Sequence, residues 1–212
     1  MITDLGFDSR FTIDHSRLTT LKKLLSQLTN SICTSALCTA LACCTILGCQ
    51  PKADYTTVKE PLKNFKAELD DSIRGAKSIE DLSCYFYLAL KGDISYEQLS
   101  KFIPDSNELV RMYTLTGSKL PTGQEIKIAA DTIHFALHRS FIETKSRASI
   151  FHASWLESKY DNVMILEMEG QKLPSKKIII VAQDDKQTLR ASALCMQIDG
   201  RWFIGEDIRF GV

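Results

Sequence analysis

The sequence has no excess of either charge and no motif of a known catalytic or cofactor site. Its 212 residues include 26 Lys and Arg and 26 Asp and Glu, so the formal net charge is +0. Domains that bind nucleic acid are typically basic, and we therefore expect no nucleic-acid partner. The chain also lacks the HExxH metal motif, the phosphate-binding P-loop and the serine nucleophile elbow. The sequence accordingly predicts no metal and no cofactor, and it leaves open whether the protein is an enzyme.

The longest apolar run of the chain is short for a transmembrane helix. A spanning helix takes about 20 apolar residues, whereas the uncharged segment Ile32–Cys49 is shorter and is diluted by Cys, Thr and Ser. Lys22 and Lys23 precede this segment, and small residues lie near its end. A positive flank, a short apolar core and small residues at a processing point are typical of an export signal. We therefore interpret residues 1–48 as a signal segment.

The end of the apolar core resembles a known processing site. Ile46-Leu47-Gly48-Cys49 is similar to the lipobox of bacterial lipoproteins, in which an aliphatic residue, a tolerant position and a small residue precede an obligatory Cys. The resemblance implies that a diacylglycerol is attached to Cys49, that the chain is cleaved before Cys49 and that the new terminus is acylated. Ala40-Leu41-Ala42-Cys43 is a second and poorer candidate, because Ala is a weak residue for the first position.

The segment before the apolar core allows a different interpretation. It is about thirty residues long and contains Asp4, Asp8 and Asp14, which a positive flank would not favour. Translation could start later than Met1, which would give a signal of ordinary length. Otherwise these residues form a cytoplasmic tail, and the apolar core is an uncleaved membrane anchor. The sequence leaves both alternatives open.

The lipobox resemblance also implies a location. Two or more acyl chains attach a protein stably to a membrane, whereas one chain gives weak and reversible binding. We therefore expect a lipid-anchored protein of the cell envelope that faces the periplasm, with the membrane as its partner through the lipid on Cys49. The outer membrane is favoured over the inner one, because Gln50 lacks the acidic character that signals inner-membrane retention in enteric lipoproteins.

The rest of the chain has the length of a single domain. We interpret residues 49–77 as a lipidated tether and a linker followed by a helix, because this part is charged and contains Pro51 and Pro61. Residues 78–212 are long enough to bury a hydrophobic core of their own. Cys84 and Cys195 lie in this domain. They either form a disulfide in the oxidising periplasm or are two small buried apolar side chains.

Helical signals occupy the first half of the domain. Ser78 is typical of an N-cap and Gly92 of a helix end, so they enclose a first helix. Shorter helices are predicted over 96–102 and 107–115, and Thr122 begins a long helix that extends to about Arg147. The long helix carries two apolar stripes on roughly opposite sides, which predicts a helix packed on both sides. The first stripe consists of Ile126, Ala130, Ile133 and Leu137, and the second of Ile128, Phe135 and Ile142.

Beyond Trp155 the period of the pattern changes from 3.6 to 2, which predicts strands. The expected strands cover 163–168, 177–182, 189–198 and 202–210. Asp199-Gly200 is a tight-turn signal between the last two of them. Helices followed by an antiparallel meander indicate an α+β fold, with N-terminal helices packed on a curved antiparallel sheet of about four C-terminal strands. In this arrangement Trp202 and Ile204 face the long helix.

This order of elements resembles the nuclear transport factor 2-like (cystatin-like) superfamily. The residues that carry the resemblance are Leu88-Ala89-Leu90-Lys91-Gly92-Asp93, at the end of the first helix, and Ile198-Asp199-Gly200-Arg201-Trp202-Phe203-Ile204, in the last hairpin. The resemblance covers residues 78–212 and implies helices lying on a curved sheet that forms a cone. Members use the cone in different ways, so the fold does not by itself determine a function.

The long helix carries the candidate site residues. Asp131, His134 and His138 lie on one side of this helix, between the two apolar stripes. An Asp that orients a His is a familiar acid–base arrangement, and two His one turn apart are able to bind a metal. A row of polar side chains that faces solvent or the sheet edge is the simpler interpretation. The sequence therefore favours a lipid-anchored binding or assembly module of unknown molecular role. The alternative is a small-ligand-binding or enzymatic cone-shaped domain with a site near His134.

Overall fold

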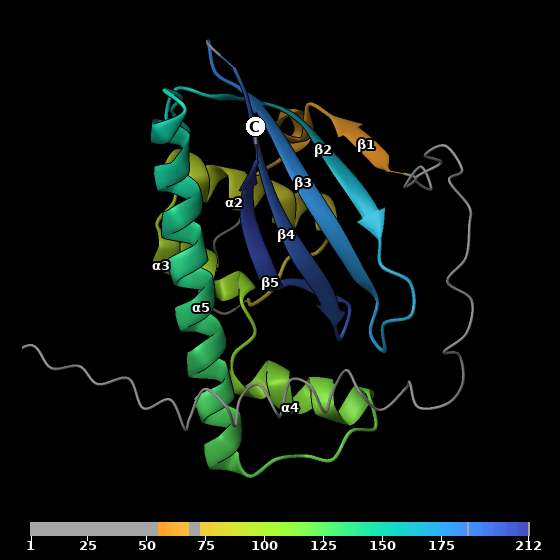
Figure 1. Ribbon diagram of the computed structural model, residues 1–212. Helices are drawn as coiled ribbons and strands as arrows, with labels where there is room; N and C mark the ends of the chain where they lie inside the picture. Colours follow the sequence, from red (N-terminus) through yellow and green to blue (C-terminus); the bar gives the residue numbers. More distant parts are fainter. Residues whose placement is uncertain (1–54, 68–72, 186, 212) are drawn as a thin grey trace, which may run out of the picture. The chain divides into compact units, whose positions relative to one another are not determined.

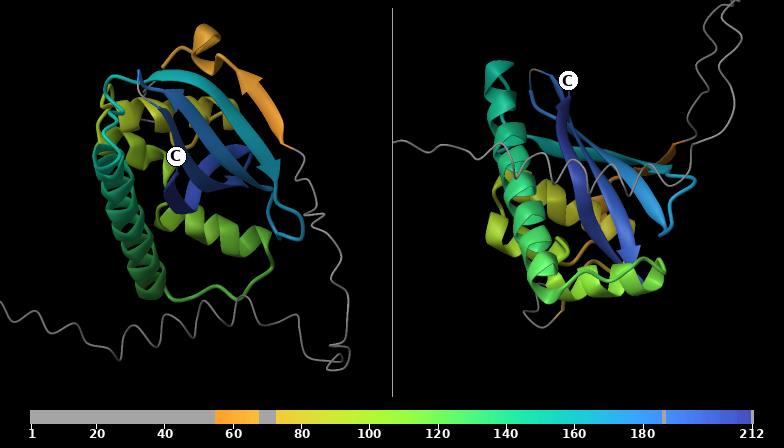
Figure 2. Two further views of the ribbon diagram at one scale, coloured as in Figure 1. Left: turned by 45° about the horizontal axis from the view of Figure 1, so that its top comes forward. Right: turned by 60° about the horizontal axis from the view of Figure 1, so that its bottom comes forward.

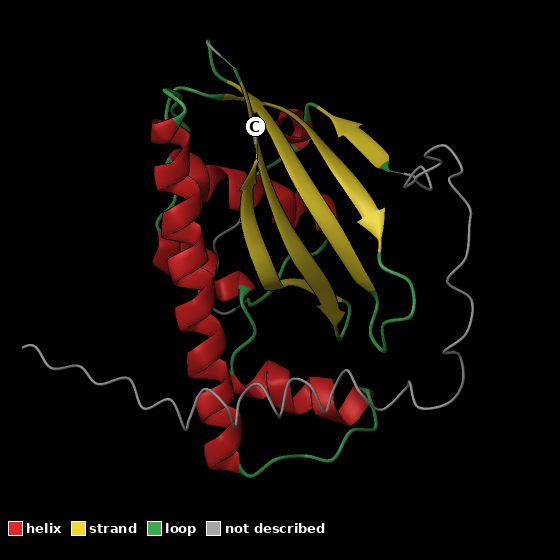
Figure 3. Cartoon of the chain, viewed as in Figure 1, coloured by secondary structure: helices red, strands yellow, loops and turns green. Residues whose placement is uncertain are grey.

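The computed structural model describes residues 55–67, 73–185 and 187–211, and these residues form an α+β fold (Figures 1 and 3). The helices lie in the first two thirds of the described chain, and four long strands follow them. The helices are α2 (Ile79–Lys91), α3 (Tyr96–Leu99), α4 (Ser106–Leu115) and α5 (Gly123–Ile150), with short 3-10 helices η1 (Pro61–Asn64) and η2 (Ser100–Phe102). The strands are β1 (Thr56–Lys59), β2 (Lys159–Glu167), β3 (Ser175–Gln183), β4 (Thr188–Ile198) and β5 (Arg201–Gly211).

The strands form one antiparallel sheet in the order β1-β2-β3-β4-β5. The four C-terminal strands lie where the period-2 pattern predicts them, and the turn between β4 and β5 falls at Asp199 and Gly200. The fifth strand, β1, corrects the expected number of about four strands and lies where the sequence predicted a linker, with the short helix η1 after it. It pairs with β2 through Thr56 opposite Ile165 and is only 4 residues long, too short for alternation to identify it.

Local signals explain the bounds of α2. The Ser78 hydroxyl accepts a hydrogen bond from the backbone N–H of Asp81, as an N-cap does. The helix ends at Gly92, whose φ of 96° places it in the left-handed region that glycine adopts without strain. The backbone N–H of Asp93 then bonds to the carbonyl of Leu88 and completes the C-cap. Both ends were predicted from the sequence.

One face of the sheet is buried against α2, which lies behind the sheet in Figure 1. The side chains on this face alternate along each strand with side chains on the other face, as β geometry requires. Their exposed fractions run from 0% to 5%, so this face is filled by packed side chains. The set from β2, β3 and β4 consists of Val163, Ile165, Ile178, Ile180, Ala182, Leu189, Ala191, Ala193 and Cys195.

The long helix α5 lies along the β5 edge of the sheet (Figures 1 and 2). Thr122 caps it through a hydrogen bond from the backbone N–H of Glu125, and the Glu125 carboxylate bonds back to the N–H of Thr122. Leu137 belongs to the main core together with Trp202 and Ile204 of β5. The prediction that the last hairpin packs on the long helix is therefore confirmed.

The second apolar stripe of α5 corrects the expectation of a helix packed on both sides. Ile128, Phe135 and Ile142 have exposed fractions of 52%, 70% and 53%. We call these three residues the outer stripe. They lie opposite the buried residues of the helix, so the described elements pack against one side of α5 only. The periodicity of the sequence predicts two apolar stripes. It does not indicate that the other described elements pack against only one of them.

A short segment before α2 extends the sheet beyond β5. The backbone N–H and carbonyl of Ala76 both bond to Trp202, with N···O distances of 2.9 Å. Gly75, with a φ of 73°, lies against the ring of Phe203, and an added Cβ would come within 2.6 Å of the Cζ of that ring. This contact brings Arg74, the next residue toward the N-terminus, to the side of the fold where α4 begins.

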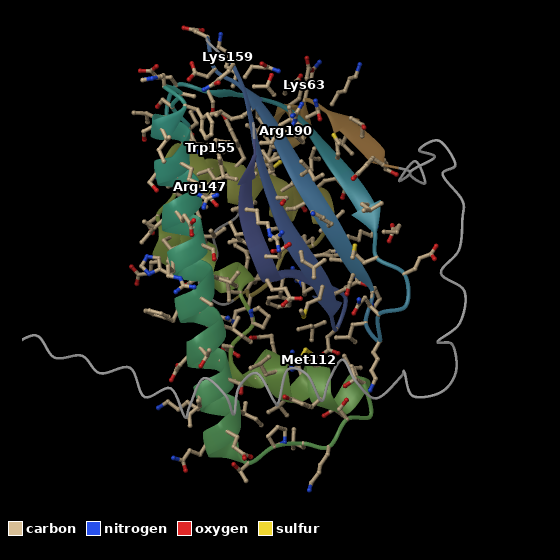
Figure 4. All side chains as sticks on the ribbon, viewed as in Figure 1. Lys63, Met112, Arg147, Trp155, Lys159 and Arg190 are labelled. Carbon is tan, nitrogen blue, oxygen red and sulfur yellow. The ribbon has the colours of Figure 1, made fainter. Side chains whose placement is uncertain are left out.

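Both tryptophans belong to the core. Trp155 is 3% exposed and donates a hydrogen bond of 3.3 Å from Nε1 to the carbonyl of Thr144. Figure 4 shows Trp155 on the sheet side of α5, where its ring meets Phe210 edge to face at a centroid distance of 6.4 Å. Trp202 is 6% exposed, and the ammonium of Lys176 lies 5.4 Å from its ring centroid.

Candidate functional site

The expected lipid-attachment residue, Cys49, lies outside the described residues, as does the whole signal segment 1–48. The described chain begins at Tyr55. Among the residues that the structure describes, no helix has both the length and the apolar character to cross a membrane. The lipidation of Cys49 therefore stays a prediction.

The three candidate residues of the long helix have different surroundings. Asp131 and His138 are exposed, whereas His134 is half-buried. The ring of His138 packs against Tyr96 of α3, with a centroid distance of 4.2 Å, and the Tyr96 hydroxyl donates a hydrogen bond to the carbonyl of His134. In the described part of the chain, no group of three or more His, Cys, Asp and Glu is arranged to hold a metal ion.

His134 lies beside the start of α4. Its ring lies beside the backbone carbonyl of Pro104, and Arg74, Asp105 and Asp131 are its charged neighbours. Burial lowers the pKa of His134 below 6.5, and the positive charge of Arg74 adds to this effect. The Pro104 carbonyl and the carboxylates of Asp105 and Asp131 oppose the shift. The neutral imidazole is therefore favoured in the folded protein more than in the unfolded chain.

Arg74 connects the segment before α2 to the start of α4. Its Nη2 donates a hydrogen bond of 2.6 Å to the carbonyl of Ile103, and its Nε lies 3.2 Å from Oε2 of Glu108 and 3.4 Å from Oδ2 of Asp105. The Arg74 and Asp105 side chains are 31% and 35% exposed, but that of Glu108 is 8% exposed. A buried carboxylate needs a cation or hydrogen-bond donors, and Glu108 has both.

The two carboxylates also cap α4. Asp105 Oδ1 accepts hydrogen bonds from the backbone N–H groups of Asn107 and Glu108, and Glu108 Oε2 accepts one from the N–H of Asp105. This reciprocal pattern is a capping box. Burial raises the pKa of Glu108, and Asp105 beside it adds to the rise. Burial also acts to raise the pKa of Asp105, but its hydrogen bonds and Arg74 outweigh burial and lower that pKa.

We call Arg74, Asp105, Glu108 and His134 the α4 clamp. The spacing Asp105-x-x-Glu108 is a local capping signal in the sequence that could have identified both carboxylates. Arg74 has no such signal, because it lies 34 residues before Glu108 in the sequence. The hydrogen bonds of the clamp bind the backbone at the start of α4. The clamp therefore holds α4 against α5 and the segment before α2.

A second polar group lies in the core between α2 and β2. The Tyr87 hydroxyl donates a hydrogen bond of 2.7 Å to the carbonyl of Ser158, and the Tyr160 hydroxyl donates one of 2.9 Å to Oγ of Ser83. The two phenol rings stack at a centroid distance of 4.5 Å. Burial raises the pKa of Tyr160, which keeps its hydroxyl protonated. This group satisfies buried polar atoms and joins the helix to the sheet.

The two domain cysteines are buried and unpaired. Of the two alternatives that the sequence left open, the structure has the pair of small buried side chains. Burial raises the pKa of the Cys84 thiol to about 12 and also raises that of Cys195. A thiol must lose its proton to act as a nucleophile, so neither has the surroundings of a reactive cysteine.

Comparison with known proteins found no relative of this chain. No family model matches the chain, and neither a curated protein nor a solved structure matches it. The nuclear transport factor 2-like resemblance therefore stays a prediction.

Proposed function

We propose that this protein is a lipid-anchored component of the bacterial cell envelope and acts as a binding or assembly module. A diacylglycerol on Cys49 holds it at the membrane, and the α+β domain faces the periplasm. Support for the anchor comes from Ile46-Leu47-Gly48-Cys49, which ends an apolar core preceded by Lys22 and Lys23. Gln50 favours the outer membrane for the reason given above.

The observation that carries the binding role is the outer stripe of α5. Phe135 is 70% exposed near the middle of a 28-residue helix, and Ile128 and Ile142 extend the stripe in both directions. Lines of exposed apolar side chains are characteristic of surfaces that contact another molecule. The ionisable groups of the α4 clamp, in contrast, are bonded to backbone within the domain.

We also propose that the domain has a nuclear transport factor 2-like fold. A nuclear transport factor 2-like fold is supported by the helices that precede the meander, by α2 on one face of the sheet and by Trp202 of the last hairpin packed in the core with Leu137 of α5. Such a fold does not require catalysis, because its sheet face serves as a filled core in some members. The packed side chains on the α2 face of this sheet are consistent with a binding role.

Metabolic labelling with palmitate tests the anchor. We expect the label in the wild-type protein and in Cys43→Ala, and its loss in Cys49→Ala. Cys43 is the matched control because it is the poorer lipobox candidate in the same segment. Label that persists in Cys49→Ala would contradict the assignment. The intact mass of the membrane-bound protein separates cleavage before Cys49 from an uncleaved anchor with a cytoplasmic tail.

One observation favours the alternative of a ligand-binding or enzymatic site near His134. Half-buried His134 has Arg74 and two carboxylates as neighbours. Groups of this kind also form hydrogen bonds and ion pairs with polar ligands. This alternative predicts that protein purified from its host retains a small molecule that His134→Gln loses. Native mass spectrometry measures this directly, and wild-type protein without added mass would count against the alternative.

A further inference from the structure

The outer stripe has the width of a helix-pairing seam. Ile128, Phe135 and Ile142 recur every seven residues, a spacing that drifts only about 20° around a helix per step. Asp131 and Arg139 stand between them and are exposed. A helix that lies in a membrane surface needs a broad apolar face of about 100° or more, without charges inside it. The stripe therefore fits a second helix better than a lipid surface.

The residues along this seam are arranged symmetrically about Phe135. Going outward from Phe135 in either direction along the chain, successive seam residues are four, three and four positions apart. Apolar residues meet apolar ones under this symmetry, neutral polar residues meet neutral polar ones, and an acid meets a base. The seam consists of Gln124, Ile128, Asp131, Phe135, Arg139, Ile142 and Ser146.

We infer that the occupant of the outer stripe is a second copy of this chain, with the two α5 helices antiparallel about a twofold axis at Phe135. Phe135 then packs on the partner's Phe135, and Ile128 packs on the partner's Ile142. Such an isologous contact is closed, because each copy offers the same patch to the other. The inference rests on the proposed binding or assembly role and names the partner.

The charges in the seam determine the orientation. Asp131 and Arg139 lie four residues before and after Phe135, so an antiparallel pair places Asp131 opposite the partner's Arg139. A parallel pair would place like charges at both levels. Within the described residues, neither Asp131 nor Arg139 makes an ion pair, and both are exposed. Their charges are thus available to a partner copy.

The expected dimer is weak in solution and stronger on a membrane. The seam from Gln124 to Ser146 measures about 33 Å along the helix axis, from a rise of 1.5 Å per residue. A single helix pair of this length lies at the small end of specific interfaces. Attachment of both copies to one membrane raises their effective concentration, which favours a contact that is weak in solution.

Cysteine cross-linking of the full chain in its own membrane tests this arrangement. Phe135→Cys brings two thiols together across the axis, and we expect a disulfide-linked dimer upon mild oxidation. Ile142→Cys alone should not cross-link, because its two copies lie about 21 Å apart along the helix axis. Co-expressed Ile128→Cys and Ile142→Cys chains should cross-link to each other. The unmodified protein is the control for the cysteines of the signal segment. Leu115→Cys on α4 is the control for a site outside the stripe, because Leu115 is 53% exposed, as Ile142 is.

Charge exchange gives a second readout with Phe135→Cys as the reporter. Asp131→Arg or Arg139→Asp alone places like charges together, and we expect about a fivefold loss of cross-linked dimer. The two changes combined restore opposite charges and should restore the yield. Both residues are exposed, so the fold tolerates the exchange.

The outcomes separate this inference from the proposed function. Cross-linking of Ile142→Cys alone as readily as Phe135→Cys would overturn the antiparallel arrangement. No cross-link at Phe135→Cys, in a protein that still incorporates palmitate at Cys49, would overturn the second copy as occupant and leave the lipid-anchored module standing. Failure of labelling at Cys49 together with a Phe135→Cys dimer would overturn the anchor and support the dimer.

Discussion

Arg74 Nε donates a hydrogen bond of 3.2 Å to Glu108 Oε2, across 34 residues of sequence. This contact joins the segment before α2 to the first turn of α4, and it compensates the charge of a carboxylate that is 8% exposed. The same guanidinium donates to the carbonyl of Ile103, which fixes the chain just before the helix. A pair of this kind is costly to break, because the remaining charge stays buried without a partner.

Arg74→Ala should therefore destabilise the domain by about 2 kcal/mol, since hydrogen bonds to charged groups are worth that order of energy. Urea denaturation of the purified protein measures the change in the free energy of unfolding. In a Glu108→Gln background the same substitution should cost much less, because no buried charge is left uncompensated. Equal costs in both backgrounds would show that the two side chains are not coupled.

The stability of the wild-type protein relative to His134→Gln should depend on pH. Burial lowers the pKa of His134 below 6.5, so the unfolded chain takes up a proton at a higher pH than the folded protein does. Stability contributed by the neutral imidazole is present above pH 6.5 and is lost as the pH falls from 6.5 toward the lowered pKa. Urea midpoints for both proteins across this range measure the effect. Parallel curves would contradict the buried environment of His134.

Trp202→Ala should cost about 3–5 kcal/mol of unfolding free energy, which is the usual range for removing a large buried aromatic side chain. Trp202 is 6% exposed and lies in the core cluster that contains Leu137 of α5. Leu156→Ala is the control, because Leu156 is 68% exposed and should change stability by about 0.5 kcal/mol or less. A Trp202→Ala protein as stable as the parent would show that the last hairpin does not pack on α5.

Gly75→Ala and Gly170→Ala separate backbone strain from steric contact. The two glycines have nearly equal φ values, 73° and 76°, in the region that strains other residues. An added Cβ at Gly75 meets Phe203 at 2.6 Å, whereas one at Gly170 meets nothing within 4 Å. We expect a loss of about 1 kcal/mol at Gly170 from strain and roughly twice that at Gly75. Thermal denaturation compares them, and equal losses would contradict the close contact.

The sequence identified most elements because their signals are local. Ser78, Gly92 and Thr122 act on backbone groups within one turn, so they marked helix ends correctly. Period-2 patterns over 163–168, 177–182, 189–198 and 202–210 marked β2 to β5 in the same way. Strand β1 was missed because 4 residues contain too little alternation, and its stability comes from pairing with β2 about a hundred residues later.

The candidate site was predicted only in part. Asp131, His134 and His138 share one side of α5, as their spacing indicated. Of the three, only His134 lies beside the start of α4. Its neighbour Arg74 comes from a segment that pairs with β5 through Ala76, and that pairing brings it to the clamp. The spacing of residues in the sequence does not indicate that Arg74 and His134 lie close together in the fold.

The sequence by itself determined the α+β order, the helix caps and the existence of two apolar stripes on the long helix, because hydrogen bonding and periodicity act between neighbours in the chain. Only the tertiary structure decided which stripe is buried. Leu137 lies in the same core cluster as Trp202, while Phe135, two residues earlier, is 70% exposed. Burial requires a partner surface, and the described domain forms one against a single side of α5.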